Sequence, residues 1–176
     1  MTQTVTSVDK MFYSAIAFNG QVANWDFSGC IDCNWEYLFS HAIAFEGKQI
    51  DTWINYQTVN STLGMFQQNE NFNADVSTWN IVHSNVKSTA HMFHGCTSFT
   101  GIGLQTWNMA IVENTAHMFH DCKLFTGVSV QNWKVDSVEN MASMFENAGL
   151  QDYVSCNRNG GVKTCDSIFQ PDLSGW

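Results

Sequence analysis

The chain has 176 residues, a formal net charge of −9 and only 13% charged residues, about half the usual share. A negative charge of this size repels phosphate groups, and no cluster of Lys and Arg offsets it. The composition therefore argues against nucleic acid and anionic membrane surfaces as partners. Nowhere do eighteen apolar residues follow one another, so no membrane-spanning helix is predicted. Hydrophobic residues make up 44% of the chain, enough for a continuous core.

A unit of about 27 residues recurs along the chain, and each copy centres on a Phe that usually follows a Met. Aligned on that Phe, the copies follow one another in steps of 27, 27, 27, 26, 26 and 24 residues. The aligned positions are Phe12, Phe39, Phe66, Phe93, Phe119, Phe145 and Phe169. A fixed period in this range is typical of stacked units, because no single unit can bury its own apolar face. The sequence predicts a single solenoid domain over 1–176.

The first part of each copy has the apolar spacing of a helix. Apolar or small residues stand seven, four and one residues before the Phe, at the Phe itself and three residues after it. In the fourth copy these residues are Val86, Thr89, Met92, Phe93 and Cys96. A spacing close to 3.6 predicts a short helix of about ten residues. Such a helix is too short to persist alone, so stacking must stabilise it.

The second part of each copy has the pattern of a short strand. A second aromatic follows six residues after the first Phe, then a turn, and then a Trp thirteen or fourteen residues after the Phe. The Trp positions are Trp25, Trp53, Trp79, Trp107 and Trp133. Alternation around each Trp predicts a strand with the Trp facing inward. The predicted fold is α/β: a leucine-rich-repeat-like solenoid with a short helix and a short parallel strand in each of six to seven coils.

The copies divide the chain into seven predicted repeats. Their approximate bounds are 5–30, 31–57, 58–85, 86–111, 112–137, an irregular repeat 138–161 and a partial or capping repeat 162–176. The irregular repeat lacks the second Phe and the Trp, and its Asn-Arg-Asn-Gly-Gly centre predicts a loop. A last helix is expected from Val162 to Phe169. The final residues, Asp172 to Trp176, restart the pattern and stop, which indicates a truncation or a natural cap.

The columns Val-x-x-x-x-x-Met-Phe, then Phe-Asn-Gly, then Val-x-x-Trp-Asp resemble the repeat of BspA-like leucine-rich-repeat surface proteins. The nearest copy runs from Met11 through Asn19 and Gly20 to Asp26. The resemblance covers nearly the whole chain and implies a leucine-rich-repeat-like solenoid at a cell or particle surface, acting in adhesion or protein binding. It implies no catalytic residues. The expected location is extracellular or on a surface, with the interior of an organelle or assembly as the alternative.

The outward residues beside each Trp form the predicted binding face for a protein or glycan partner. They are Asn24, Asp26, Thr52, Thr78, Asn80, Thr106, Asn108, Asn132 and Lys134. The predicted function is a non-catalytic interaction or adhesion module. The alternative is a structural subunit of a larger complex, such as a coat or particle, favoured by the scarcity of charge. No Gly-rich phosphate loop or metalloprotease helix motif occurs, so neither an enzyme nor a cofactor is predicted.

Two pairs of histidines recur in register in consecutive copies. They are His91 with His94, and His117 with His120. Residues three apart share one side of a helix, and Zn²⁺, Ni²⁺ or Cu²⁺ accepts imidazole ligands. The same columns hold unrelated residues in other copies, however, and adjacent helices lie about 8–10 Å apart, which is wide for the ligands of one ion. The favoured interpretation is a solvated helix surface, and no metal site is predicted.

The six cysteines allow several disulfide states. Cys156 and Cys165 bracket the terminal loop and are disulfide candidates. Cys30 and Cys33 form either a local disulfide or two free thiols, because the βαβ context of a redox-active pair is missing. Cys96 and Cys122 replace Ala in an inward column and are expected to be buried thiols. A bridge between them needs Cα atoms within about 7 Å, less than the helix spacing.

Overall fold

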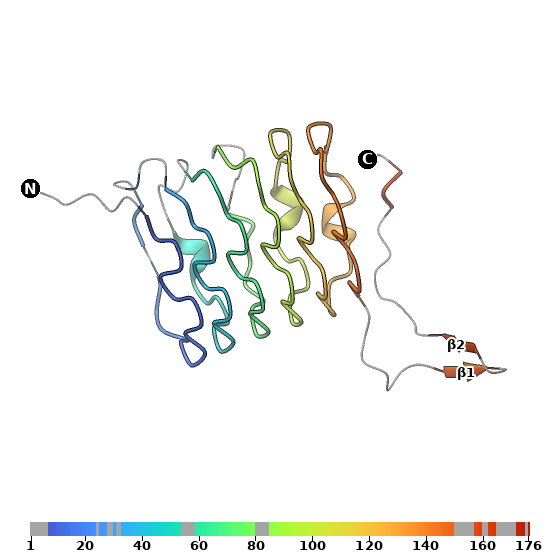
Figure 1. Ribbon diagram of the computed structural model, residues 1–176, viewed down its shortest axis with the longest axis horizontal. Helices are drawn as coiled ribbons and strands as arrows, with labels where there is room; N and C mark the ends of the chain where they lie inside the picture. Colours follow the sequence, from blue (N-terminus) through green and yellow to red (C-terminus); the bar gives the residue numbers. More distant parts are fainter. Residues whose placement is uncertain are drawn as a thin grey trace, which may run out of the picture.

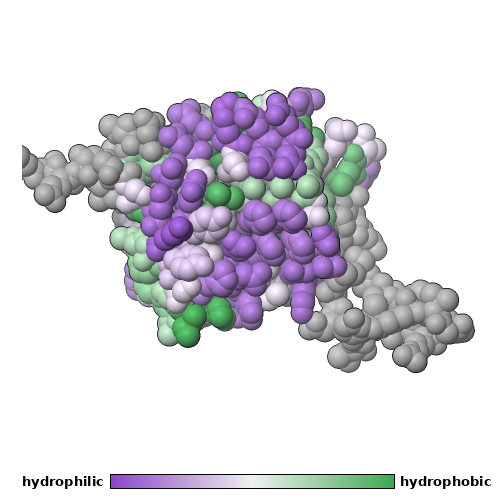
Figure 2. All heavy atoms as spheres, viewed as in Figure 1, coloured by the Kyte–Doolittle hydropathy of each residue, from purple (hydrophilic) through white to green (hydrophobic). Residues whose placement is uncertain are grey.

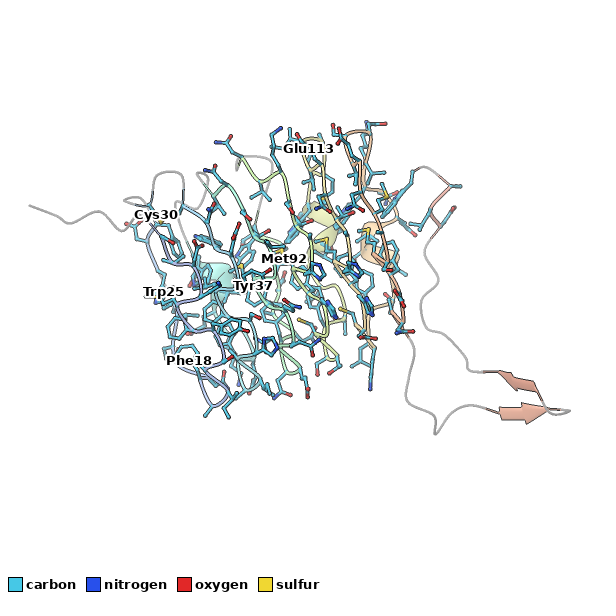
Figure 3. The ribbon with its side chains drawn as sticks, viewed as in Figure 1. Phe18, Trp25, Cys30, Tyr37, Met92 and Glu113 are labelled. Carbon is cyan, nitrogen blue, oxygen red and sulfur yellow. A yellow bond between two sulfur atoms is a disulfide. The ribbon has the colours of Figure 1, made fainter. Side chains whose placement is uncertain are left out.

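The computed structural model describes residues 7–23, 25–27, 30, 33–53, 59–79, 85–149, 157–159, 162–164, 172–174 and 176. The chain winds into a row of coils that lie side by side in sequence order (Figure 1). In the first coil Phe18 lies toward the lower end and Cys30 toward the upper end, with Trp25 between them (Figure 3). The backbone of this coil therefore runs from the lower part of the row toward the upper part (Figure 3).

Regular secondary structure is scarce in the described part of the chain. There are three short 3-10 helices: η1 (Ile50–Thr52), η3 (Leu104–Thr106) and η4 (Val128–Val130). The strands β1 (Asn157–Asn159) and β2 (Val162–Thr164) pair antiparallel in the register Asn157↔Thr164, Arg158↔Lys163 and Asn159↔Val162. Single parallel bridges link the coils through Asn34, Ser61, Ser88, Asn114 and Asn140. Within the described part of the chain, no helix has the length and apolar character needed to span a membrane.

The predicted α/β fold, with a helix and a parallel strand in each coil, is wrong. The described residues contain no α-helix, and the Met-Phe segments are instead runs of tight turns. Around Phe93 the backbone N–H groups alternate between two kinds of partner. The N–H of Phe93 donates to the carbonyl of Met118 in the next coil at 3.0 Å, whereas the N–H of His94 donates to His91 within the coil at 3.1 Å. The same alternation recurs in the neighbouring coils.

The backbone dihedral angles explain why these segments are not helices. Two columns, one two residues before the central Phe and one two residues after it, have φ between 51° and 73°. The first column holds Lys10, Tyr37, Gly64, His91, His117 and Ser143, and the second holds Ser14, His41, Gln68, Gly95, Asp121 and Asn147. A left-handed residue ends a right-handed helix, because its N–H and C=O turn away from the helix axis. A left-handed residue every four positions therefore converts a helical apolar pattern into a ribbon of turns.

In the part of the chain that the structure describes, the strands predicted around the Trp residues are also absent. Trp53 directly follows η1 and Trp107 directly follows η3, and each is a single extended residue, with ψ of 143° and 136°. Their indole N–H groups donate to carbonyls of the preceding coil, Trp53 to Val22 at 2.7 Å and Trp107 to Val76 at 3.0 Å. The Trp side chains thus connect coils where the prediction placed a sheet.

The core consists of stacked aromatic rings. The central Phe rings of consecutive coils lie 5.2–5.8 Å apart with interplanar angles of 3–10°, from Phe12 to Phe145. Phe66 and Phe93 are fully buried, and Trp107 is 4% exposed. Burial of one Phe contributes about 1.5–3 kcal/mol, and a stacked aromatic pair adds about 0.5–1.5 kcal/mol. Outside this core, the coil face turned toward the viewer is mostly hydrophilic (Figure 2).

The C-terminal part departs from the coils. The strands β1 and β2 lie apart from the row (Figure 1). The helix predicted from Val162 to Phe169 is wrong in its described part, because Val162–Thr164 is a strand. The chain then contacts the coils again at Trp176, whose ring stacks on Trp133 at 6.4 Å. The N–H of Trp176 donates to Leu173 as that of Trp133 donates to Val130, so this end repeats the geometry of a Trp turn.

Ser143 offers a direct test of the turn ribbon, because it is exposed and has φ of 51°. The variant Ser143→Gly should be more stable than Ser143→Ala by about 1 kcal/mol, since Gly adopts the left-handed region without a steric cost. In a helix interior the order is reversed, because Ala is favoured over Gly there by about 1 kcal/mol. Urea denaturation of both variants measures the difference. The control Ala142→Gly, beside the left-handed column, should lose stability.

Candidate functional site

The turns present one set of outward side chains, which we call the turn face. It consists of Lys10, Tyr13, Ser14, Tyr37, His41, Gln67, Gln68, His91, His94, His117, His120, Asp121, Ser143, Glu146 and Asn147, none of which is buried. These residues come from the two left-handed columns and from the column that directly follows the central Phe. Because hydrogen bonds hold the coils in register, equivalent side chains lie one coil apart along this face.

At the N-terminal end of the turn face, aromatic and polar side chains contact one another across coils. The rings of Tyr13 and His41 lie 5.5 Å apart. The Lys10 ammonium lies 5.7 Å from the centre of the Tyr37 ring, within the range of a cation–π contact. The hydroxyl of Ser40 is 2.9 Å from Nδ1 of His41. These contacts hold three ring side chains in place at the surface.

Further along the face, four histidines form a two-by-two grid. Within each coil the Nδ1 atoms face each other at 3.1 Å, in His91 with His94 and in His117 with His120. Between coils the rings stack, His91 on His117 at 4.7 Å and His94 on His120 at 4.6 Å. The sequence pattern argues against a metal site because adjacent helices lie about 8–10 Å apart. That spacing is wrong for this chain, because the histidines do not lie on packed helices. Hydrogen-bonded coils bring the rings into contact.

The backbone positions this grid. His91 and His117 have φ of 55° and 57°, and His is among the residues that tolerate the left-handed region. The N–H of His120 donates to the carbonyl of His117 at 3.2 Å, so one tight turn sets the pair. The N–H of Gly95 then donates to the carbonyl of His120 at 2.8 Å, which fixes the distance between the two coils.

Two carboxylates border the grid. Oδ2 of Asp121 lies 3.4 Å from Nε2 of His120 and 4.0 Å from Nε2 of His94. Oε2 of Glu146 lies 3.8 Å from Nδ1 of His120. The amide of Asn147 donates to Oδ1 of Asp121 at 2.9 Å, which turns the other oxygen toward the histidines. The grid and Asp121 thus place nitrogen and oxygen donors around one point.

The environment favours the neutral form of His91 and His94. Burial, reinforced by the nearby His120 and His91, lowers the pKa of His94 from 6.5 to about 4, and the opposing effect of Asp121 is smaller. Burial also lowers the pKa of His91, again with a contribution from neighbouring histidines. A neutral imidazole keeps a lone pair, so at neutral pH both rings remain able to accept a hydrogen bond or a metal ion.

A subset of the grid has the composition of a metal site. One ligand atom each from His94, His120 and Asp121 lie within 4.8 Å of one another. The side chains of His94 and His120 are 18% exposed, and that of Asp121 is 43% exposed. Imidazole and carboxylate together suit Zn²⁺, Ni²⁺ and Cu²⁺. The recurring columns of the sequence pointed to the four histidines but not to Asp121.

The residues beside the Trp column occupy a different part of the coils. Asn24 and Asn80 lie outside the described residues, and Asp26, Asn108, Asn132 and Lys134 are exposed. The three threonines of this set form hydrogen bonds within a coil or between coils. The hydroxyl of Thr78 donates to the Asp51 carbonyl, and that of Thr106 to the Ser77 carbonyl, in the preceding coil. The Thr52 hydroxyl donates to Gln49 within its own turn. The threonine hydroxyls thus stabilise the coils.

The cysteines fall into three groups. Cys30 and Cys33 are joined by a disulfide near one end of the first coil (Figure 3). Cys96 and Cys122 are free and buried, and their thiols donate to backbone carbonyls of the preceding coils. Burial raises the pKa of both thiols, so neither forms a reactive thiolate at neutral pH. Cys156 and Cys165 lie outside the described residues.

The sequence pattern assigned Tyr13 and Tyr37 to an ordinary solvated surface and did not single out His41. A signal for their arrangement was present in the same columns. Gly64 and Gly95 stand in the two left-handed columns together with Ser, Asn, Asp, His, Gln, Lys and Tyr, and neither column holds a β-branched residue. Such a composition is typical of left-handed positions and would have predicted a turn.

A family model described as "Mycoplasma protein of unknown function, DUF285" matches residues 1–101 and 33–156, which together extend over most of the chain. No curated protein and no solved structure matches.

The lowered pKa of His94 predicts a pH dependence of stability. Between pH 6.5 and about 4, the unfolded chain binds a proton at this residue while the folded chain does not. The free energy of unfolding should therefore fall as pH falls through this window. The variant His94→Gln should lose less stability over the same window, as measured by urea denaturation at several pH values. Gln67→Ala, on the same face without a titratable group, should keep the wild-type dependence.

Proposed function

The chain belongs to the DUF285 family, whose description names no function, and we propose that it is a non-catalytic interaction module. The partner is a protein that docks on the turn face. The sequence resemblance to BspA-like surface proteins supports the same proposal, because that family acts in adhesion and protein binding. An extracellular or surface location is part of the proposal.

The observation that supports this function best is the row of ring side chains on the turn face. Tyr13, Tyr37 and His41 lie at one end of it, and the histidine grid lies further along. Each ring combines an apolar body with a polar edge, and Tyr is enriched in protein interfaces for this reason. The contacts between rings and the hydrogen-bonded turns hold these side chains before any partner arrives. Preorganisation of this kind lowers the entropy cost of binding.

The sequence predicted a different binding face, formed by the residues that flank the Trp column. The hydroxyls of Thr78 and Thr106 already donate to backbone carbonyls, so they offer less to a partner. Asn132 and Lys134 remain exposed there and serve as a reference surface. The two faces can therefore be distinguished within one chain.

Site-specific photo-crosslinking tests the choice of face. A benzophenone amino acid at Gln67, on the turn face, should give a discrete protein adduct in the cells that produce this chain. The same group at Lys134 should give none. Adding Tyr37→Ala to the Gln67 probe should reduce the adduct at least tenfold, because truncation of an aromatic anchor costs about 2 kcal/mol or more. If the probe at Lys134 gave an adduct and the probe at Gln67 gave none, the binding site would lie on the Trp-flanking face instead.

A specific observation also favours the alternative, a structural subunit that assembles by stacking. The carbonyl oxygens of Asp9, Met11 and Tyr13 accept no hydrogen bond from the described residues, although the equivalent carbonyls of later coils do. Met11 and Ile16 are 60% and 63% exposed, whereas the equivalent Met92 is fully buried. An open row of acceptors beside apolar side chains is a template for a further coil, from this chain or from another copy.

Sedimentation velocity across a wide concentration range tests the assembly alternative. If the first coil adds another copy, the mean mass should rise with concentration. The double variant Met11→Lys and Ile16→Lys should remain monomeric, because charged side chains on an open edge oppose pairing. The matched variant Ile102→Lys and Ile111→Lys, at exposed positions in an interior coil, should behave as the parent chain. A chain that stays monomeric throughout contradicts assembly through this edge.

A further inference from the structure

We propose that His94, His120 and Asp121 bind one divalent transition-metal ion, with Zn²⁺ as the reference ion. The proposal goes beyond the interaction module, because the site lies within one chain and needs no partner. It rests on geometry. Nε2 of His120 and Oδ2 of Asp121 are 3.4 Å apart, and Nε2 of His94 is 4.0 Å from the same oxygen.

The distances suit a small ion. Zn²⁺ binds nitrogen and oxygen at about 2.0–2.2 Å, so two ligands of a tetrahedral ion lie about 3.4 Å apart. Asp121 and His120 already have this separation. The three ligand atoms all lie within 4.8 Å of one another, so the His94 ring has to move closer to Asp121 when an ion binds. Further coordination positions stay open to water.

The hydrogen bonds around the ligands are compatible with the tautomers that a metal ion requires. Nδ1 of His94 faces Nδ1 of His91 at 3.1 Å, and Nδ1 of His120 faces Nδ1 of His117 at 3.1 Å. Each contact needs one proton, and a proton on Nδ1 of His94 or His120 leaves its Nε2 with a lone pair. These two Nε2 atoms are the ones that face Asp121. His91 and His117 thus act as positioning residues, as metal-bound histidines usually require.

Electrostatics also favours a cation at this point. Two imidazole nitrogens and a carboxylate oxygen lie within 4.8 Å of one another. A cation at this point would interact favourably with all three ligand atoms. The amide of Asn147 holds the other oxygen of Asp121, which keeps the carboxylate aimed at the rings. Ca²⁺ and Mg²⁺ are poor candidates, because they prefer oxygen ligands.

Isothermal titration of the full, metal-free chain with Zn²⁺ tests the proposal. We expect one ion per chain with a dissociation constant in the micromolar range or below. His120→Asn should weaken binding at least a hundredfold. Asp121→Asn, which keeps the shape of the side chain, should weaken binding at least tenfold. The matched control His41→Asn removes a histidine from the same face but not from the grid, and should bind as tightly as the parent chain.

Co²⁺ provides a second measurement that reports coordination directly. Visible d–d absorption should appear with one equivalent of Co²⁺ in the parent chain and in His41→Asn, and should be lost in His120→Asn. Thermal melting without metal shows whether His120→Asn has failed to fold. If it has, the affinity of Asp121→Asn for Zn²⁺ decides whether the proposal holds. The proposal is overturned if several ions bind weakly at scattered sites, or if His120→Asn and Asp121→Asn both bind as the parent chain does. Failure of the crosslinking test leaves this result unaffected.

Discussion

The structure depends on the way backbone N–H groups alternate between two partners. In the Met-Phe segments from Phe12 to Phe119, every second N–H closes a tight turn within its own coil, and the others donate to the next coil, as Phe93 does to Met118. Left-handed residues on either side of the central Phe make this alternation possible. Because each coil satisfies the donors of its neighbour, the coils must stack in register. The aromatic rings then stack as a consequence.

The same alternation accounts for the surface. Coils joined by hydrogen bonds lie much closer than packed helices, so equivalent side chains contact their neighbours across coils. His94 and His120 stack at 4.6 Å for this reason, and Lys10 reaches the ring of Tyr37. When two consecutive coils carry the same chemical group in one outward column, the two groups therefore lie in contact with each other. Both the proposed interaction face and the proposed metal site depend on this property.

The burial of the Phe and Trp columns was predictable from the sequence, because their period marks the inside whatever the backbone does. The backbone itself was not predicted. A helix and a ribbon of turns both place residues such as Thr89, Met92 and Cys96 on the inside, so the apolar pattern does not distinguish them. Gly64 and Gly95 in outward columns were the available evidence against a helix. The histidine grid was named and then rejected, because the distance used came from the wrong backbone.

Scalar couplings across hydrogen bonds, measured by NMR, test the alternation most directly. The account predicts a coupling from the amide nitrogen of Phe66 to the carbonyl carbon of Met92, 26 residues later, where the N–H donates at 2.9 Å. It also predicts a coupling from Gln67 to Gly64 within the coil. A coupling from Phe66 to Thr62, four residues earlier, would show a helix and contradict the account.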